Sequence, residues 1–306
     1  MIDPTSLYRV FFDDDSRPLG LPMIGALSGF TDAGNAIKQF AEHIFDNLDY
    51  ELVVQFENDE LLDYRSRRPV MFFEKDHIAS YTPPILAVYL VTDEAGEPFL
   101  FLHGYEPDFK WDAFSESVVS IIEDLRVSSF TWIHSVPFPI PHTKPVAITV
   151  SGNRADLSGQ ISQWRPETEV PGNVMHLLEF KLAALGLPTV GFVFLAPHYL
   201  ADNEFPAVAL AAFEQITVST GLVFPTDELR EANQLFVSKL DEQVGQNADL
   251  TKMISKLEKD YADESIAPIR APIAPPAASM PSADEIANEL EDYLASRRRN
   301  LADEDD

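Results

Sequence analysis

Short apolar runs alternate along this chain with longer segments of helical period, and this alternation limits the possible folds more than any other feature. Residues 21–28 (LPMIGALS) form an apolar run of strand length, and in residues 32–48 apolar side chains recur every three or four positions. Farther along, the apolar run 187–199 is followed by a second helical pattern at 205–221. Strands that alternate with helices predict a three-layer α/β/α domain with a mixed, mostly parallel sheet.

Two segments depart from the simple alternation. The runs 85–91 and 98–102 are separated by TDEAGE, in which Gly96 suits a hairpin, so we expect these two strands to pair antiparallel. In PFPIPHTKP (137–145) four prolines argue against regular structure between them. We therefore expect an antiparallel part of the sheet and one irregular segment near the middle of the chain.

The composition divides the chain into four parts. Residues 1–225 form the predicted α/β core, and residues 226–264 have the pattern of two charged amphipathic helices that pack on the core or on a neighbouring subunit. Residues 265–281 are rich in Pro and Ala and have no period, which is typical of a linker. Residues 282–306 combine an apolar row at helical spacing with an acidic end, and predict a tethered helix that needs a partner surface.

Charge and composition exclude several classes of function. The chain has 50 Asp and Glu against 22 Lys and Arg, and its net charge of −28 repels nucleic acids and anionic membranes. It has no cysteine, so thiolate catalysis, disulfides and zinc–thiolate sites are excluded. No stretch has the roughly 18–20 apolar residues of a membrane span, and the N-terminus lacks a signal-peptide pattern. We expect a cytoplasmic protein with no nucleic-acid or membrane partner.

The loop after the first long apolar run raises the question of a nucleotide site. GFTDAGNA (29–36) has the glycine spacing of a phosphate-binding loop, but Asn35 and Ala36 stand where that loop needs Lys and Ser or Thr. Asp32 would also repel a phosphate at the start of the helix. Two interpretations stay open: Asp32 or Thr31 caps the helix, or Asp32 and Asn35 border a cleft that holds a carboxylate or a carbonyl.

Three arginines lie close together in NDELLDYRSRRPV (58–70), at Arg65, Arg67 and Arg68. Guanidinium groups pair carboxylates and phosphates through two parallel hydrogen bonds, so this local concentration of scarce positive charge is a candidate anion or partner site. The alternative is that the acidic residues of the same segment neutralise the arginines, because surface ion pairs are common.

Two more candidates follow predicted strands. Glu106 lies in a turn after the run 98–102, and His198 lies at the C-terminal end of the run 187–199. Ligands of open α/β sheets bind at the carboxyl ends of strands, so both residues are candidates for a pocket wall, although a structural role is an alternative for each. The histidines have no metal-binding spacing, and no motif such as G-x-S-x-G joins a nucleophile to a base. The sequence therefore predicts no metal, no cofactor and no catalytic residue.

Five motifs in this order resemble the bacterial branch of the proteasome assembly chaperone 2 family. They are GFTDAGNA (29–36), NDELLDYRSRRP (58–69), GYEPDFKWDAF (104–114), VPFPIPHTKP (136–145) and APHYL (196–200). The resemblance covers about residues 6–225. It implies a phosphorylase/hydrolase-like α/β/α domain and self-association into a homo-oligomer, for which a trimer is one option.

The resemblance also bears on function. Eukaryotic and archaeal members of the family are chaperones of proteasome rings, and those that dock on the ring use a C-terminal tail with a hydrophobic residue, a tyrosine and any last residue. The present sequence ends in Glu304, Asp305 and Asp306, so we expect that docking element to be missing. We expect a non-catalytic protein-interaction or assembly factor that binds protein partners.

An enzyme or small-ligand binder is the alternative. It would be of the hydrolase, phosphorylase or ATP-dependent ligase type, with a site at the carboxyl end of the sheet. The residues that would line the site are Asp32, Asn35, Arg65, Arg68 and Glu106.

Overall fold

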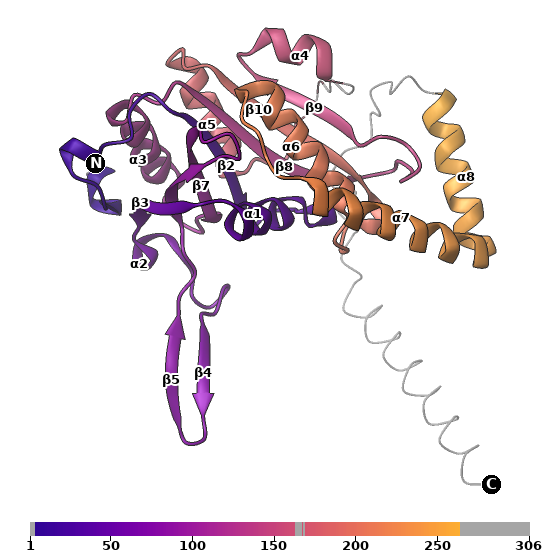
Figure 1. Ribbon diagram of the computed structural model, residues 1–306, viewed down its shortest axis with the longest axis horizontal. Coiled ribbons are helices and arrows are strands. Elements are labelled where there is room, and N and C mark those ends of the chain that lie inside the picture. The colour runs from indigo at the N-terminus through magenta and orange to yellow at the C-terminus, as the bar shows by residue number, and fades with distance from the viewer. Residues whose placement is uncertain (1–3, 163–166, 168, 264–306) are drawn as a thin grey trace, which may run out of the picture. The chain divides into compact units, whose positions relative to one another are not determined.

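A mixed eight-stranded sheet forms the centre of the fold in the computed structural model (Figure 1). The structure describes residues 4–162, 167 and 169–263, so the predicted linker and tethered helix lie outside the described residues. The strand order is β1-β3-β6-β7-β2-β8-β10-β9. The strands are β1 (Tyr8–Val10), β2 (Pro22–Ser28), β3 (Tyr50–Phe56), β6 (Ala87–Thr92), β7 (Pro98–Tyr105), β8 (Ser129–Phe138), β9 (Ala147–Gly152) and β10 (Thr189–Pro197).

The parallel part of the sheet lies in its middle. Strands β7, β2, β8 and β10 run parallel, whereas β6, β3 and β1 on one side and β9 on the other pair antiparallel. The central strands are almost wholly buried, as expected for parallel strands covered on both faces. The antiparallel pairing of β6 with β7 agrees with the hairpin expected at Gly96. The predicted fold class is confirmed.

Helices cover both faces of the sheet (Figure 1). One apolar core lies under α1 (Ala36–Asn47) and α6 (Pro206–Thr220), and the other lies under α3 (Trp111–Asp124) and α5 (Val174–Ala184). The remaining helices are α2 (Asn58–Leu61), α4 (Ala155–Ile161), α7 (Asp227–Gln246), which packs on α6, and α8 (Ala248–Asp263). Among the described residues no helix has both the length and the apolar character that a bilayer crossing requires.

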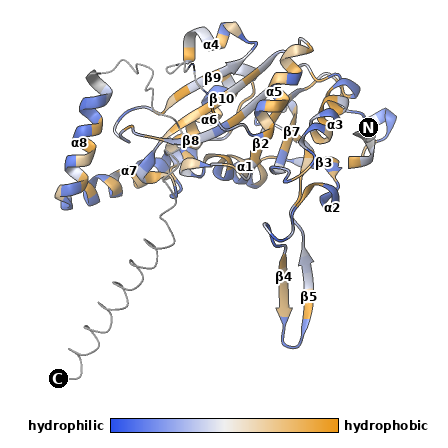
Figure 2. Cartoon of the chain, turned by 180° about the vertical axis from the view of Figure 1, so that it is seen from behind, coloured by the Kyte–Doolittle hydropathy of each residue, from blue (hydrophilic) through white to orange (hydrophobic). Residues whose placement is uncertain are grey.

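A two-stranded hairpin is the main feature that the sequence pattern did not predict. Within the described residues, strands β4 (Val70–Glu74) and β5 (His77–Thr82) pair with each other and with no further strand, and we call residues 70–82 the arm. The arm extends away from the eight-stranded sheet in both views (Figures 1 and 2). Every residue of both strands is exposed.

The proline-rich segment begins later than expected. Strand β8 continues through Pro137 to Phe138, so the first proline of PFPIPHTKP is part of the sheet. The register of β2 on β8 ends at Trp132, and Pro137 has β10 as its strand neighbour. A proline is tolerated at such an edge-like position because no second strand needs its missing N–H.

Aromatic side chains fill the core under α1. Phe40 is fully buried, and its ring stacks on Phe213 with 4.3 Å between centroids. Phe101 and Phe224 also lie against it, at 6.0 Å and 6.4 Å. Because Phe40 joins the helix to the sheet and to α6, the anchorage of α1 depends on it.

Truncation of Phe40 is therefore expected to destabilise the fold. Phe40→Ala should lower the free energy of unfolding by about 3–5 kcal/mol, because it removes a buried ring and leaves a cavity. Phe180→Ala, at a side chain that is 74% exposed, is the matched control and should change stability by at most about 0.5 kcal/mol. Urea denaturation of both variants tests this, and equal losses would contradict the packing described.

Candidate functional site

The chain takes opposite directions after two neighbouring parallel strands. From β2 it passes to α1 on one face of the sheet, and from β7 it passes to α3 on the other face. The strand ends stay joined up to this point, since Glu106 N donates to Ser28 O at 2.6 Å. In open α/β sheets a ligand crevice forms where such connections diverge. A ligand site is therefore expected at the ends of β2 and β7, where Glu106 lies.

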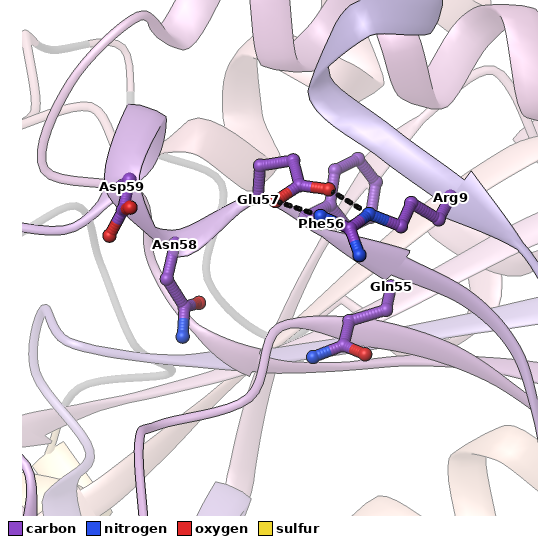
Figure 3. Close-up of a pocket in the computed structure, with 6 residues that line it drawn as sticks. All are labelled: Arg9, Gln55, Phe56, Glu57, Asn58 and Asp59. Atoms are coloured by element: carbon purple, nitrogen blue, oxygen red, sulfur yellow. Dashed lines mark hydrogen bonds and ion pairs between the residues drawn. The ribbon is translucent and has the colours of Figure 1, made fainter.

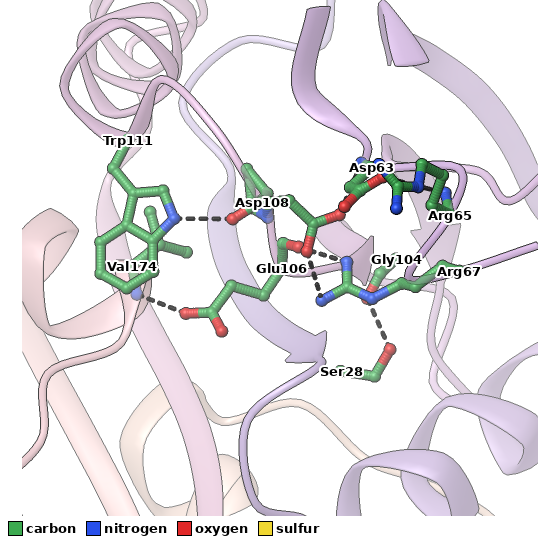
Figure 4. Close-up of polar contacts among 10 residues, drawn as sticks. Ser28, Asp63, Arg65, Arg67, Gly104, Glu106, Asp108, Trp111 and Val174 are labelled. Carbon is green, nitrogen blue, oxygen red and sulfur yellow. Dashed lines mark hydrogen bonds and ion pairs between the residues drawn. The ribbon is translucent and has the colours of Figure 1, made fainter. Parts of the chain in front are cut away.

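The guanidinium of Arg67 occupies this position (Figure 4). It donates to the backbone carbonyl of Glu106, and its Nη2 lies 3.2 Å from Asp108 Oδ1. The Tyr105 ring centroid is 5.5 Å from the guanidinium carbon, within range for a cation–π contact. The side chains of Arg67 and Asp108 are only 25% and 18% exposed. We call these three contacts of Arg67 the clasp.

Two glycines lie at the ends of β2 and β7. Gly29 has φ 142°, and a Cβ there would lie 2.6 Å from Arg67 Nη2. Gly104 has φ 139°, and a Cβ there would lie 2.2 Å from the carbonyl oxygen of Ile85. Both positions need glycine for conformation and for space. The first glycine of GFTDAGNA thus allows an arginine of the same chain to approach β2.

Glu106 uses its side chain to hold a helix. Its Oε1 accepts the N–H of Val174, the first residue of α5, at 2.7 Å (Figure 4). Burial raises the pKa of Glu106, while the Val174 hydrogen bond and the charge of Arg67 act in the opposite direction. A carboxylate at a helix N-terminus is also favoured by the helix dipole. Glu106 therefore connects the end of β7 to α5.

Asp32 is bound to the start of α1. Its two carboxylate oxygens accept the backbone N–H groups of Ile37 at 2.8 Å and Lys38 at 3.1 Å. The hydroxyl of Ser135 in β8 donates to the same carboxylate at 3.2 Å. These bonds correspond to the helix-capping interpretation of the GFTDAGNA loop.

A buried histidine lies on the other side of the same loop. His134 is 3% exposed, its Nε2 is 3.1 Å from Thr31 Oγ1, and its ring stacks on Phe30 at 5.4 Å. Burial and, to a smaller extent, the nearby His176 lower the pKa of His134 to about 4. His134 is therefore neutral near pH 7.

The other predicted site residues do not join this group within the described part of the chain. Asn35 adopts a left-handed backbone (φ 52°) immediately before α1, and its carbonyl accepts from the Gln39 side chain. Arg65 and Arg68 are exposed, and His198 is exposed in the turn after β10, where its ring contacts Tyr199. The structure brings Arg67 and Glu106 together and leaves these four residues apart from them.

Three polar residues of this region were not among the predicted site residues. Asp108 pairs Arg67, and His134 lies behind the loop after β2. Glu179 is a third, because it accepts from Trp132 Nε1 at 2.7 Å and Ser151 Oγ at 2.6 Å, and burial raises its pKa. Asp108 had a signal in the sequence, since it follows Glu106 by two residues in the same turn. Nothing in the sequence indicated Glu179, because the residues that its side chain contacts are distant from it along the chain.

An open pocket lies at the edge of the sheet where β1 pairs with β3 (Figure 3). Its lining comprises Arg9, Gln55, Phe56, Glu57, Asn58 and Asp59. The charges are paired within the chain, since Arg9 Nε lies 2.5 Å from Glu57 Oε1, and Asp59 accepts from Tyr64 at 2.8 Å. The Asn58 amide is held by Tyr105 and by the carbonyl of Pro84. No group of three His, Cys, Asp or Glu side chains suited to a metal ion occurs in the described residues.

Comparison with known proteins agrees with this fold. The model of the PAC2 family matches residues 26–244. The chain belongs to the PAC2 family. This confirms the resemblance to the proteasome assembly chaperone 2 family found in the sequence motifs.

Two solved structures have substantial sequence identity with this chain. The Mycobacterium tuberculosis protein Rv2714, of unknown function, is 39% identical with a TM-score of 0.76, over 84% of this chain and 91% of that one. A Corynebacterium glutamicum protein of unknown function is 32% identical with a TM-score of 0.79, over 86% and 98% of the two chains.

A third structure is named for a function. The Mycobacterium tuberculosis proteasome-assembly chaperone homologue Rv2125 is 18% identical with a TM-score of 0.69, over 76% of this chain and all (100%) of that one. At that identity the likeness shows the fold alone. The comparison with curated proteins gave no match.

Removal of the clasp should destabilise the PAC2 fold. Arg67→Ala leaves the carboxylate of Asp108 partly buried without its cation, and should lower the free energy of unfolding by about 2 kcal/mol. Lys239→Ala, at an exposed residue of α7, is the control and should change it by at most about 0.5 kcal/mol. Denaturation of the two variants at neutral pH tests this. A loss in Arg67→Ala no larger than in the control would mean that the clasp is not structural.

His134 should make stability depend on pH. Between its unfolded pKa near 6.5 and its folded pKa of about 4, the unfolded chain binds a proton that the folded chain does not. The stability that neutral His134 contributes is therefore present above pH 6.5 and is lost as the pH falls toward 4. Over that range the wild type should lose roughly 3 kcal/mol more than His134→Gln. His198→Gln is the exposed control, and a pH profile of His134→Gln parallel to the wild type would contradict the assignment.

Proposed function

We propose that this protein is a non-catalytic protein-interaction or assembly factor with a role similar to that of proteasome assembly chaperones. Membership of the PAC2 family supports the proposal, as does the similarity in fold to a proteasome-assembly chaperone homologue and to an archaeal proteasome activator, PbaB. The observation that carries it is that side chains of the chain itself fill the crevice at the carboxyl ends of β2 and β7.

A small-ligand site would need polar groups that point into a cavity and are available to the ligand. Here Arg67 donates to the Glu106 carbonyl and forms an ion pair with Asp108, and the Glu106 side chain accepts from α5. Asp32 likewise accepts from α1 and Ser135. A phosphate or carboxylate would have to displace Asp108 from Arg67 before it could bind there. The groups that an enzyme of this fold class would use are engaged in holding the elements together.

An enzyme or small-ligand binder with a site at the carboxyl end of the sheet is the second candidate. One observation favours it: Glu106 is a half-buried carboxyl group with a raised pKa at the point where ligands bind in related architectures. Ligand binding there would require Arg67 to move. A hydrolase, phosphorylase or ligase activity would then use Glu106 as an acid or base.

Direct binding to proteasome subunits tests the proposal. The purified full-length protein is mixed with separately purified proteasome α and β subunits of the same organism, and complexes are measured by sedimentation. We expect a complex with unassembled subunits, and an unrelated protein of similar negative charge serves as the control. The absence of a complex with either subunit would count against a proteasome-related role.

A ligand screen separates the two candidates. Thermal shifts are measured against nucleotides, phosphate, sugars, carboxylates and divalent metals. A ligand at a hundredfold excess over its dissociation constant stabilises by about 2.7 kcal/mol, so binding would be visible. We expect no shift. A shift that Glu106→Gln abolishes and Arg65→Ala retains would support the enzyme candidate instead.

A further inference from the structure

A cleft lies on the flank of α6, between this helix, α7 and β9. Its volume is about 590 Å³, within the ~300–1,000 Å³ of pockets that hold small molecules. It shares no lining residue with the clasp or with the pocket of Figure 3. We call it the α6 cleft, and its large apolar lining comprises Val146, Ile148, Ile161, Phe205, Leu210 and Val237.

Two alanines of α6 keep the cleft open. Ala207 and Ala211 are one turn apart and line it with Leu210, whereas Val208 and Ala212 of the same helix are fully buried in the core. An alanine side chain is a single methyl group, so the helix does not fill the space between itself and β9. Both alanines also pack on the apolar core, and the floor of the cleft is therefore continuous with that core.

Two side-chain amides of the cleft have an oxygen without a partner. Gln215 Oε1 and Asn233 Oδ1 are buried and accept no hydrogen bond from the described residues. An acceptor that has lost water without gaining a donor is unfavourable, and such groups are rare in folded proteins. Each residue as a whole is half-buried, and the last torsion of an amide side chain is soft, so either oxygen can turn toward a donor in the cleft.

The charges at the cleft favour an uncharged molecule as the donor. Arg230 is paired with the carboxylate of Glu214 at 3.4 Å, and Lys144 is exposed at the rim. An ammonium group would meet the lysine and would have to compete with Arg230 for Glu214. An uncharged N–H or O–H group meets no such opposition. In contrast to the strand ends, this cleft combines an apolar floor with polar groups that are still available.

We propose that the α6 cleft binds a small, uncharged, apolar molecule with an N–H or O–H group, which donates to the amide oxygen of Gln215 or Asn233. The apolar body would cover the floor of the cleft, and the donor would supply the hydrogen bond that the free protein lacks. The inference goes beyond the proposed function, because it concerns a site away from the strand ends and requires no protein partner.

A fluorescent probe tests the site. N-phenyl-1-naphthylamine is uncharged, has two aromatic groups joined by one N–H, and fluoresces strongly in apolar surroundings. Titration of the full-length protein should saturate at one molecule per chain. Ala211→Trp fills the cleft and should abolish saturable binding. Ala232→Trp places the same ring on the exposed side of α7 and should retain it. Circular dichroism of both variants establishes that they are folded.

The two amides are tested separately, with variants that keep the cleft open. Gln215→Met/Asn233→Leu removes both acceptors at nearly constant volume and should weaken N-phenyl-1-naphthylamine about tenfold. Gln234→Met, at an exposed residue of α7, is the matched control. 1-Phenoxynaphthalene has an ether oxygen in place of the N–H, and its affinity, measured by displacement, should be equal for the wild type and the double variant. Without probe, the double variant should be as stable to heat as the wild type.

Three results would overturn the proposal. They are the absence of saturable binding to the wild type, unchanged binding to Ala211→Trp, and equal affinities of N-phenyl-1-naphthylamine for the wild type and the double amide variant. If Ala211→Trp does not fold, the amide variants still decide the question. None of these measurements involves proteasome subunits, so failure here is distinguishable from failure of the proposed function.

Discussion

The contact of Arg67 with the end of β7 is the interaction on which the rest of this structure depends. Parallel strands whose connections leave on opposite faces produce a crevice, and a crevice must hold either a ligand, water or protein. Here Arg67 fills it, and its charge is balanced by Asp108. Glycine suits position 29 because φ is 142° there and a Cβ would come within 2.6 Å of the guanidinium. Arg67 binds the backbone carbonyl of Glu106, and the side chain of Glu106 binds α5. The contacts of Arg67 therefore lie beside β2, β7 and α5.

This arrangement pairs the polar groups at the strand ends with other groups of the same chain. A ligand site in a fold of this class consists of polar groups that are held in place but left unpaired toward the cavity. In this chain those groups are paired: Asp32 with α1, Glu106 with α5 and Arg67 with Asp108. These contacts stabilise the fold.

The sequence predicted the strands and helices of the core well because burial imposes a period on them. Strand β2 and helix α1 lie where the apolar runs and the helical spacing indicate. The arm was missed because VMFFE and HIASYT have no burial pattern: both faces are exposed, and the irregularity at Phe73 breaks the alternation.

Contacts between distant residues were not predictable in the same way. Arg67 and Glu106 were both candidates, but 39 residues separate them, and only the fold shows that they meet. Arg65 and Arg68 looked equivalent to Arg67 in the sequence. The difference between them is burial, which depends on the direction in which the loop approaches the sheet.

The clasp and the arm are mechanically connected, and this relates the closed crevice to the exposed surface. Arg67 precedes Val70, the first residue of the arm, by only three positions. A guanidinium held by Glu106 and Asp108 therefore fixes the base from which the hairpin extends. If the base were free, the hairpin would lose orientational order. Binding of a partner would then carry the entropy cost of ordering the hairpin. An arginine that a ligand could recruit would release this anchor. One arginine thus contacts the end of β7 and, three residues later in the chain, leads into the arm.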